Sequence, residues 1–320
     1  MTRADRAFMQ LVLVSLSAGA LLALPLLITL FPGAFQQALH GYDAVVAVCA
    51  AALYKIGREL PPLGLVVVAL TAVSTMLAGL RVLRTLRNTG RALAHHRSVP
   101  LPTRLRNAAR RVAVQGEVVL FDDPRPFAYC CGFLRPKIWI STASVRVLRP
   151  RELEAVLHHE AVHLRRRDPL RMLIGRGLAE LFFALPLIRL LAVRFEVAKE
   201  LAADREAVRQ QGTAKHLASA LYVMGREPTP TMADIAIGAW SLAHARVDQL
   251  CGASDAQLLP GVSRRTRWLT IAALALALLL TFGQAARANL IPAAILETLE
   301  PTMNAADVHS CPLPDSGVLF

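Results

Sequence analysis

The sequence predicts an α-helical integral membrane protein that carries a cytoplasmic α+β domain with few short strands. Its 320 residues are 54% hydrophobic, with a mean hydropathy of +0.43, which is too apolar for an ordinary soluble domain. Three uncharged apolar stretches are each long enough to cross a bilayer. The formal charge of +13 is spread unevenly over the segments between these stretches, which indicates a membrane topology.

The predicted spans are residues 8–30, 62–83 and 268–286. Each contains about 20 uncharged residues, and at about 1.5 Å rise per residue this length covers the roughly 30 Å of a bilayer core. The first span could instead be a cleaved signal peptide. Its apolar run is longer than a usual signal-peptide core and contains Pro25, so we expect an uncleaved anchor. Residues 42–54 are apolar but short, and we expect a membrane-lying helix there.

Arginine residues set the predicted orientation. Residues 81–111 contain nine Arg and no Asp or Glu, whereas the connection 31–61 carries two basic and two acidic residues. Because positively charged loops stay in the cytoplasm, we expect a membrane region 1–83 with a cytoplasmic N-terminus, a cytoplasmic domain 84–267 and an extracytoplasmic tail 287–320. The arginine-rich segment could also bind nucleic acid. It adjoins a span and lacks interleaved aromatic residues, so the expected partner is the lipid bilayer rather than nucleic acid.

The predicted cytoplasmic domain contains the motif His-Glu-x-x-His at residues 159–163. Apolar residues before the motif follow helical spacing, and Asp168-Pro169 after it predicts the end of that helix. Residues four apart share one face of a helix, so His159 and His163 can bind one metal ion while Glu160 faces a water molecule on it. The motif therefore predicts one Zn²⁺ per chain, with Glu160 as the general base.

Residues 170–195 are rich in Leu, Ile and Phe but contain five charged residues and Pro186. If this segment crossed the membrane once, every later metal ligand would lie on the opposite side from the two histidines. The metal hypothesis therefore predicts a hairpin that is cytoplasmic or interfacial and does not cross the bilayer.

A third protein ligand is expected after this hairpin. Glu196, Glu200 and Asp204 share one helix face at intervals of four, and a row of acids requires positive charge opposite it. That charge could come from zinc with its histidines or simply from nearby basic side chains. We predict Glu200 as the ligand, with Glu196 as the alternative. Asp204 is then expected to accept a hydrogen bond from the outer nitrogen of a ligating histidine.

Four segments resemble the BlaR/MecR-type membrane metallopeptidases, with a more distant likeness to the CAAX-prenyl and heat-shock membrane proteases. The segments are Pro126–Tyr129, Gly132–Ser141, Glu152–Asp168 and Glu200–Asp204, and the likeness covers roughly residues 118–250. The resemblance implies a zincin-like, more narrowly gluzincin-like, domain between spans of a bacterial inner-membrane protein. In that family the first Glu of Glu-x-x-x-Asp is a zinc ligand, which here is Glu200. The β-lactam sensors carry a penicillin-binding domain after their last span. We expect none in the short tail, and we do not carry over β-lactam sensing.

The resemblance also suggests a role for residues 137–141, whose alternating pattern predicts a short strand. In zincin-like folds an edge strand beside the active-site helix pairs with an extended substrate, which makes Ile138, Trp139 and Ile140 candidate substrate-binding residues. The alternative is an ordinary core strand.

A second short likeness lies near the end of the domain. Arg246-Val247-x-x-Leu250 resembles a motif that occurs late in related domains. Either His244 or Arg246 could stabilise the oxyanion of the reaction, and a surface helix is the alternative reading of this segment.

The cysteine residues fit no zinc-binding spacing. Cys130, Cys131 and Cys251 fall on the predicted cytoplasmic side, where thiols stay reduced. Cys311 falls outside, and the sequence leaves open whether it is free or paired with Cys49 or another chain.

These observations predict a membrane-bound zinc metalloendopeptidase that cleaves a cytoplasmic protein or peptide, such as a transcriptional repressor. The alternative is a catalytically silent zinc-binding membrane adaptor or signal transducer. The intact Glu160 argues against an adaptor, because a binding module needs no base at that position. The sequence does not reveal the substrate, the activating signal or whether a homodimer forms.

Overall fold

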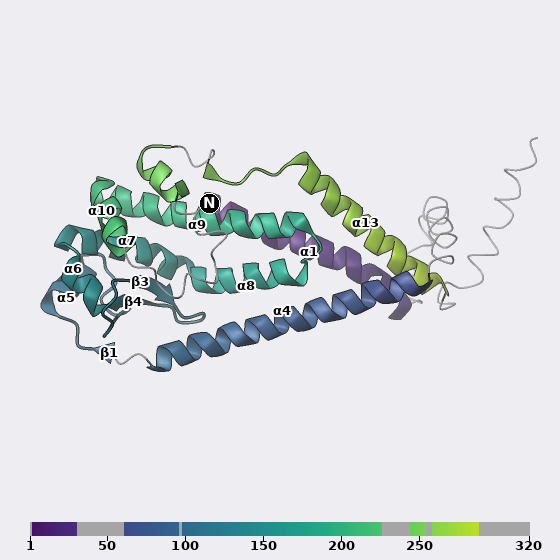
Figure 1. Ribbon diagram of the computed structural model, residues 1–320, viewed down its shortest axis with the longest axis horizontal. Coiled ribbons are helices and arrows are strands. Elements are labelled where there is room, and N and C mark those ends of the chain that lie inside the picture. Colours follow the sequence, from purple (N-terminus) through teal and green to yellow (C-terminus); the bar gives the residue numbers. More distant parts are fainter. Residues whose placement is uncertain (1, 31–60, 96–97, 226–243, 254–257, 288–320) are drawn as a thin grey trace, which may run out of the picture. The chain divides into compact units, whose positions relative to one another are not determined.

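The computed structural model describes residues 2–30, 61–95, 98–225, 244–253 and 258–287 (Figure 1). The principal helices are α1 (Arg3–Leu30), α4 (Pro61–His95), α5 (Thr103–Arg111), α6 (Thr142–Val147), α7 (Pro150–Arg166), α8 (Asp168–Leu181), α9 (Pro186–Gln211), α10 (Lys215–Met224) and α13 (Arg264–Arg287). The strands are β1 (Ser98–Val99), β2 (Val118–Phe121), β3 (Ala128–Cys131) and β4 (Lys137–Ser141). The chain divides into two compact units, one formed by Met1–Leu16 with Val73–Thr270 and the other by Ser17–Ala72 with Ile271–Phe320. Every site discussed below lies in the first unit.

One segment within the described ranges, Arg3–Ala23 in α1, is long and apolar enough to cross a membrane. The second and third predicted spans, 62–83 and 268–286, fall within α4 and α13. Their crossing of a bilayer stays a prediction. The predicted membrane-lying helix 42–54 and the predicted tail beyond residue 287 lie outside the described residues.

The small sheet has the strand order β1-β2-β4-β3. β2 and β4 run parallel, with Val118 opposite Ile138, while β3 and β4 run antiparallel, with Tyr129 opposite Trp139. β1 pairs with β2 in the antiparallel sense. The alternating pattern of residues 137–141 therefore predicted the strand β4 correctly, with the same bounds.

The prediction that this strand is an edge strand is wrong. β4 lies between β2 and β3, so its backbone hydrogen-bonding groups on both sides are engaged by neighbouring strands. Ile138 and Ile140 are fully buried, and Trp139 lies on the other face of the sheet with its ring centroid 6.2 Å from that of Phe121. β4 is thus a core strand, and the described edge on this side of the sheet is β3.

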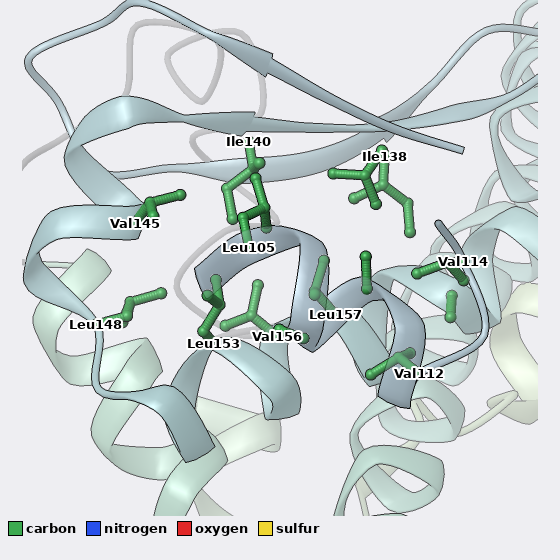
Figure 2. Packing of buried hydrophobic residues seen from close by; sticks show 14 of the residues in the cluster. Leu105, Val112, Val114, Ile138, Ile140, Val145, Leu148, Leu153, Val156 and Leu157 are labelled. Carbon is green, nitrogen blue, oxygen red and sulfur yellow. The ribbon is translucent and has the colours of Figure 1, made fainter. Parts of the chain in front are cut away.

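The hydrophobic core lies between one face of the sheet and helices α5 and α7 (Figure 2). Ile138 and Ile140 point from β4 toward Leu105 of α5 and Leu157 of α7, and all four side chains are fully buried. Because α7 and the sheet share this core, the helix that carries the His-Glu-x-x-His motif is held beside the sheet by apolar contacts.

Local signals define both ends of α7. Pro150 occupies the first turn, where no backbone donor is needed, and the backbone N–H of Arg149 donates to Glu152 Oε2 at 2.7 Å. The helix ends at Arg167, whose backbone is left-handed with φ of 53°. This left-handed turn separates α7 from α8, which starts at Asp168.

Helices α8 and α9 form an antiparallel pair joined by residues 182–185, in the segment for which a hairpin is expected. Whether this pair touches a bilayer stays a prediction. α9 also packs along α7, where Ala155 and Ala207 are fully buried with Leu217 of α10. Small side chains let the two helix backbones approach closely, which brings the acidic residues of α9 to the histidines of α7.

Candidate metal centre

Two histidines and one glutamate bring their side-chain donors to one point. His159 and His163 lie one turn apart on α7, and their Nε2 atoms are 3.2 Å apart. Glu200 on α9 places Oε2 at 3.4 Å from Nε2 of His159 and Oε1 at 3.6 Å from Nε2 of His163. Donors bound to one tetrahedral metal at 2.0–2.2 Å lie about 3.3–3.6 Å apart. These three side chains therefore fit a single metal ion.

Each histidine is braced by a carboxylate on its outer nitrogen. Asp204 Oδ1 lies 2.7 Å from Nδ1 of His159, and Asp168 Oδ2 lies 2.7 Å from Nδ1 of His163. Both carboxylates are buried. A proton on Nδ1 that is donated to a carboxylate leaves the lone pair of Nε2 available, so both imidazoles are held in the tautomer that binds a metal through Nε2.

Asp168 is the member of this arrangement that the sequence did not identify. Its position after the motif indicated only the end of a helix, and no periodic pattern connects it to His163. The left-handed turn at Arg167 is what returns the Asp168 carboxylate to that imidazole. The spacing of the acids on α9, in contrast, places both Glu200 and Asp204 beside the histidines as expected.

Glu196 lies one turn before Glu200 but outside the cluster. It accepts a hydrogen bond from Nε of Arg176 at 3.1 Å, and that arginine belongs to α8. The geometry therefore supports Glu200 over Glu196 as the third donor.

The buried charges of the cluster perturb one another strongly. Burial alone would lower the pKa of His159, but the carboxylate of Asp204 raises it to about 9. Burial alone would raise the pKa of Glu200, but the charges of Lys199 and His163 lower it well below its usual value. Without a metal, His159 thus favours its protonated form and Glu200 its ionised form. A bound metal would replace that proton as the positive charge.

Two basic side chains complete the charge balance. Lys199 pairs with Glu200, and Arg246 donates to Asp204 from Nε at 2.7 Å and from Nη2 at 2.6 Å. The forked contact directs the guanidinium of Arg246 onto a carboxylate that itself braces His159. His244, the other candidate for stabilising an oxyanion, is exposed. An oxyanion role for either residue stays a prediction, and the geometry favours a bracing role for Arg246.

Glu160 lies on α7, which carries the two histidines and packs against strand β3. It is 7% exposed on α7 and directly follows His159. Its charge also acts on Cys130 of β3, because burial and the proximity of Glu160 both raise the pKa of that thiol. A carboxylate that can act as a base therefore lies beside both the metal donors and strand β3.

The comparison with protein families agrees with this geometry. The model of the BlaR1 peptidase M56 family matches residues 45–236, which is more than half of the chain and includes α7 and α9. No curated protein matches the chain. M56 peptidases are metallopeptidases, and the cluster of His159, His163 and Glu200 could bind the metal. The resemblance that the sequence motifs indicated is confirmed, and the chain belongs to the BlaR1 peptidase M56 family of membrane metallopeptidases.

Proposed function

We propose that this protein is a zinc metalloendopeptidase whose active site is formed by α7, α9 and β3. The observation that carries the proposal is the mutual spacing of 3.2, 3.4 and 3.6 Å among the donors of His159, His163 and Glu200. Two imidazoles and one carboxylate suit zinc, and three protein ligands leave a fourth position for water. Both features are typical of catalytic rather than structural zinc sites.

The chain supplies the groups for peptide hydrolysis. Bound zinc would act as a Lewis acid toward the scissile carbonyl and lower the pKa of a bound water. Glu160 accepts the proton of the attacking water and returns it to the amine nitrogen that leaves. Asp204 and Asp168 keep the imidazoles oriented throughout.

The substrate is proposed to bind in an extended form along β3. The backbone N–H of Ser141 donates to the carbonyl of Phe127, and hydrogen-bonded pairs alternate along an antiparallel ladder. Tyr129 therefore faces β4, while the backbone groups of Ala128 and Cys130 point away from it. A peptide added at this edge would form backbone hydrogen bonds with these two residues and place its chain beside Glu160.

Arg246 is proposed as a positioning residue. Its two hydrogen bonds hold Asp204, which in turn orients the ring of His159. This role requires no contact with the substrate.

The natural substrate is proposed to be a cytoplasmic regulatory protein, such as a transcriptional repressor. Its support is the family membership together with the arginine distribution, which predicts a cytoplasmic domain. Cys251 is an exposed free cysteine in this domain and reports on that orientation. A membrane-impermeant maleimide should modify Cys251 only after cells are permeabilised, with Cys251→Ser as the control. Modification of this residue in intact cells would place the domain outside.

The central experiment compares the wild type with Glu160→Gln in detergent. Glu206→Gln is the matched control, because Glu206 lies on α9 in an exposed pair with Arg209. We expect each protein to bind about one zinc ion. The wild type and the control should cleave an unfolded substrate, and Glu160→Gln should not. Adding a chelator to the wild type should abolish cleavage as the substitution does. Zinc binding with equal cleavage by the wild type and Glu160→Gln would refute the assigned base. Zinc binding without any cleavage would favour the adaptor.

A further inference from the structure

The connection between α8 and α9 is an apolar tip. Residues 181–188 contain no charged side chain, and both Phe183 and Ala184 are exposed at the turn. The side chain of Phe183 is 48% exposed, which is unfavourable for an aromatic ring in water. This tip lies at the opposite end of α8 from Asp168, which braces the metal centre. What covers the tip follows from the helices that hold α8 and α9 in place.

Helix α8 packs closely against two apolar helices. A Cβ atom at Gly175 would lie 3.2 Å from Leu11 Cδ2, and one at Gly177 would lie 3.5 Å from Val82 Cγ2. Leu11 belongs to the segment of α1 that is long and apolar enough to cross a membrane. Val82 belongs to the predicted span 62–83. The two glycines therefore let α8 lie directly against the ends of two predicted spans.

The start of α9 contacts the third predicted span. The backbone N–H of Leu187 donates to Thr270 Oγ1 at 3.1 Å, and Thr270 lies near the start of the predicted span 268–286. Pro186 has no backbone N–H, and that of Leu185 donates within the turn at 2.9 Å. These backbone groups at the tip thus need no water, which is a requirement for backbone that enters a lipid environment.

The contacts with α1 give the direction of α8. Asp5 accepts from Arg171 Nη1 at 2.9 Å, and Leu11 contacts Gly175, so α8 runs in the same direction as α1. Phe183 comes eight residues after Gly175, which places it roughly 10 Å further in that direction at about 1.5 Å per residue. The tip therefore lies deeper along the predicted spans than the contacts that hold it.

The charged residues on either side of the tip suit the same position. Glu180 pairs with Arg81 of α4, so its charge is balanced. Arg189 is exposed on the first turn of α9. A long arginine side chain can extend to anionic headgroups while the apolar residues beside it contact acyl chains. The exposed side chains of Leu16 on α1 and Leu80 on α4 add further apolar surface from the predicted spans.

We propose that the tip of the α8–α9 pair, residues 181–188, enters the bilayer leaflet nearer the metal centre without crossing it. A lipid acyl chain is the partner because the tip is held by three predicted spans and points along them. The chain reverses at residues 182–185, so α9 returns Glu200 to the side on which α7 carries its histidines. The proposal depends on the predicted spans and requires neither metal nor peptide hydrolysis. It therefore stands or falls separately from the proposed function.

This insertion would set the distance of the metal centre from the membrane. Helix α8 has 14 residues, which correspond to about 20 Å between the tip and Asp168. The metal centre would then lie outside the hydrocarbon core, within reach of a peptide from the aqueous side.

The test places the photoreactive residue p-benzoylphenylalanine at single positions of the full chain, reconstituted in vesicles of phosphatidylethanolamine and phosphatidylglycerol. Phe183→p-benzoylphenylalanine probes the tip. Tyr222→p-benzoylphenylalanine is the matched control, because Tyr222 is an exposed aromatic residue on α10, which packs against α7 and α9. Leu16→p-benzoylphenylalanine is the lipid-facing reference on α1. Adducts are identified by mass spectrometry after irradiation, and the unfolding midpoint of each variant confirms that it is folded.

The tip and reference positions should form lipid adducts at similar yields, at least about 10-fold above Tyr222, because crosslinking requires an acyl chain in contact with the ring. Equal yields at Phe183 and Tyr222 would overturn the proposal. Crosslinks from Phe183 to a second copy of the chain in place of lipid would also overturn it, since another protomer would then cover the tip. Absence of lipid adducts at Leu16 as well would overturn it together with the predicted first span.

Discussion

Replacing Asp168 by asparagine tests the brace that only the tertiary structure revealed. The carboxylate accepts from Nδ1 of His163 at 2.7 Å and is 2% exposed, so no bulk water can take its place. Hydrogen bonds to charged groups contribute about 1.5–3 kcal/mol and those between neutral groups about 0.5–1.5 kcal/mol. Asp168→Asn keeps an acceptor but removes its charge, so it should cost about 1–1.5 kcal/mol. This corresponds to roughly 10-fold weaker zinc binding.

The alanine variant should have a larger effect. Asp168→Ala leaves Nδ1–H of His163 buried without its acceptor, which costs about 1–3 kcal/mol beyond the lost charge effect. Zinc affinity should then fall by about 100-fold. The order wild type, asparagine, alanine is the expected signature of a brace that acts through the imidazole.

The assay is competition for zinc against a chromogenic chelator, using the full chain in detergent. Asp122→Asn is the matched control, because that aspartate is exposed and accepts a hydrogen bond from Thr142 Oγ1 at 2.9 Å, away from the histidines. The unfolding midpoint of each metal-free protein separates loss of affinity from loss of folding, since Asp168 also begins α8. A folded Asp168→Asn protein that binds zinc within twofold of the wild type would refute the reasoning.

Three further predictions follow from the same site. Arg246→Gln should lower zinc affinity by about 10-fold, because glutamine cannot form both hydrogen bonds to Asp204. A loss of catalysis with unchanged zinc affinity would instead indicate that Arg246 donates to the oxyanion. Zinc affinity should rise with pH up to about 9, because the metal must displace the proton on Nε2 of His159, whose pKa the Asp204 carboxylate raises to about 9; an affinity that is constant between pH 6.5 and 8.5 would contradict this. Cys130→Pro should raise KM for a peptide substrate relative to Cys130→Ala. Proline removes the backbone N–H of residue 130, which points away from β4, and leaves the hydrogen bonds between β3 and β4 intact. Equal KM values for the two variants would exclude this edge as the binding site.

Local patterns in the sequence predicted the elements that carry the site. The helix that contains His159 and His163 follows from apolar residues at helical spacing, and it spans Pro150–Arg166. The strand at residues 137–141 follows from alternation, and its bounds match. Each pattern arises because one face of the helix or strand packs against the core, so the apolar residues of that segment recur with the period of the element.

The pairing of strands was not accessible in the same way. Alternation shows that a strand has two different faces, but it contains no information on which strands lie at its two sides. The interior position of β4 depends on pairing with Val118–Phe121 and Ala128–Cys131. The edge, and with it the proposed substrate site, therefore moved from β4 to β3.

The sequence by itself predicted His159 and His163 as metal donors and placed Glu196, Glu200 and Asp204 on one face of a later helix, because intervals of four place side chains on one helix face. Only the tertiary structure decided what surrounds them. Asp168 reaches His163 through a left-handed turn, and Arg246 reaches Asp204 from a segment 42 residues later in the chain. Neither contact follows a helical or strand period. Periodicity can identify the residues that share one face of an element, whereas turns and the packing between elements decide which residues meet from different ones.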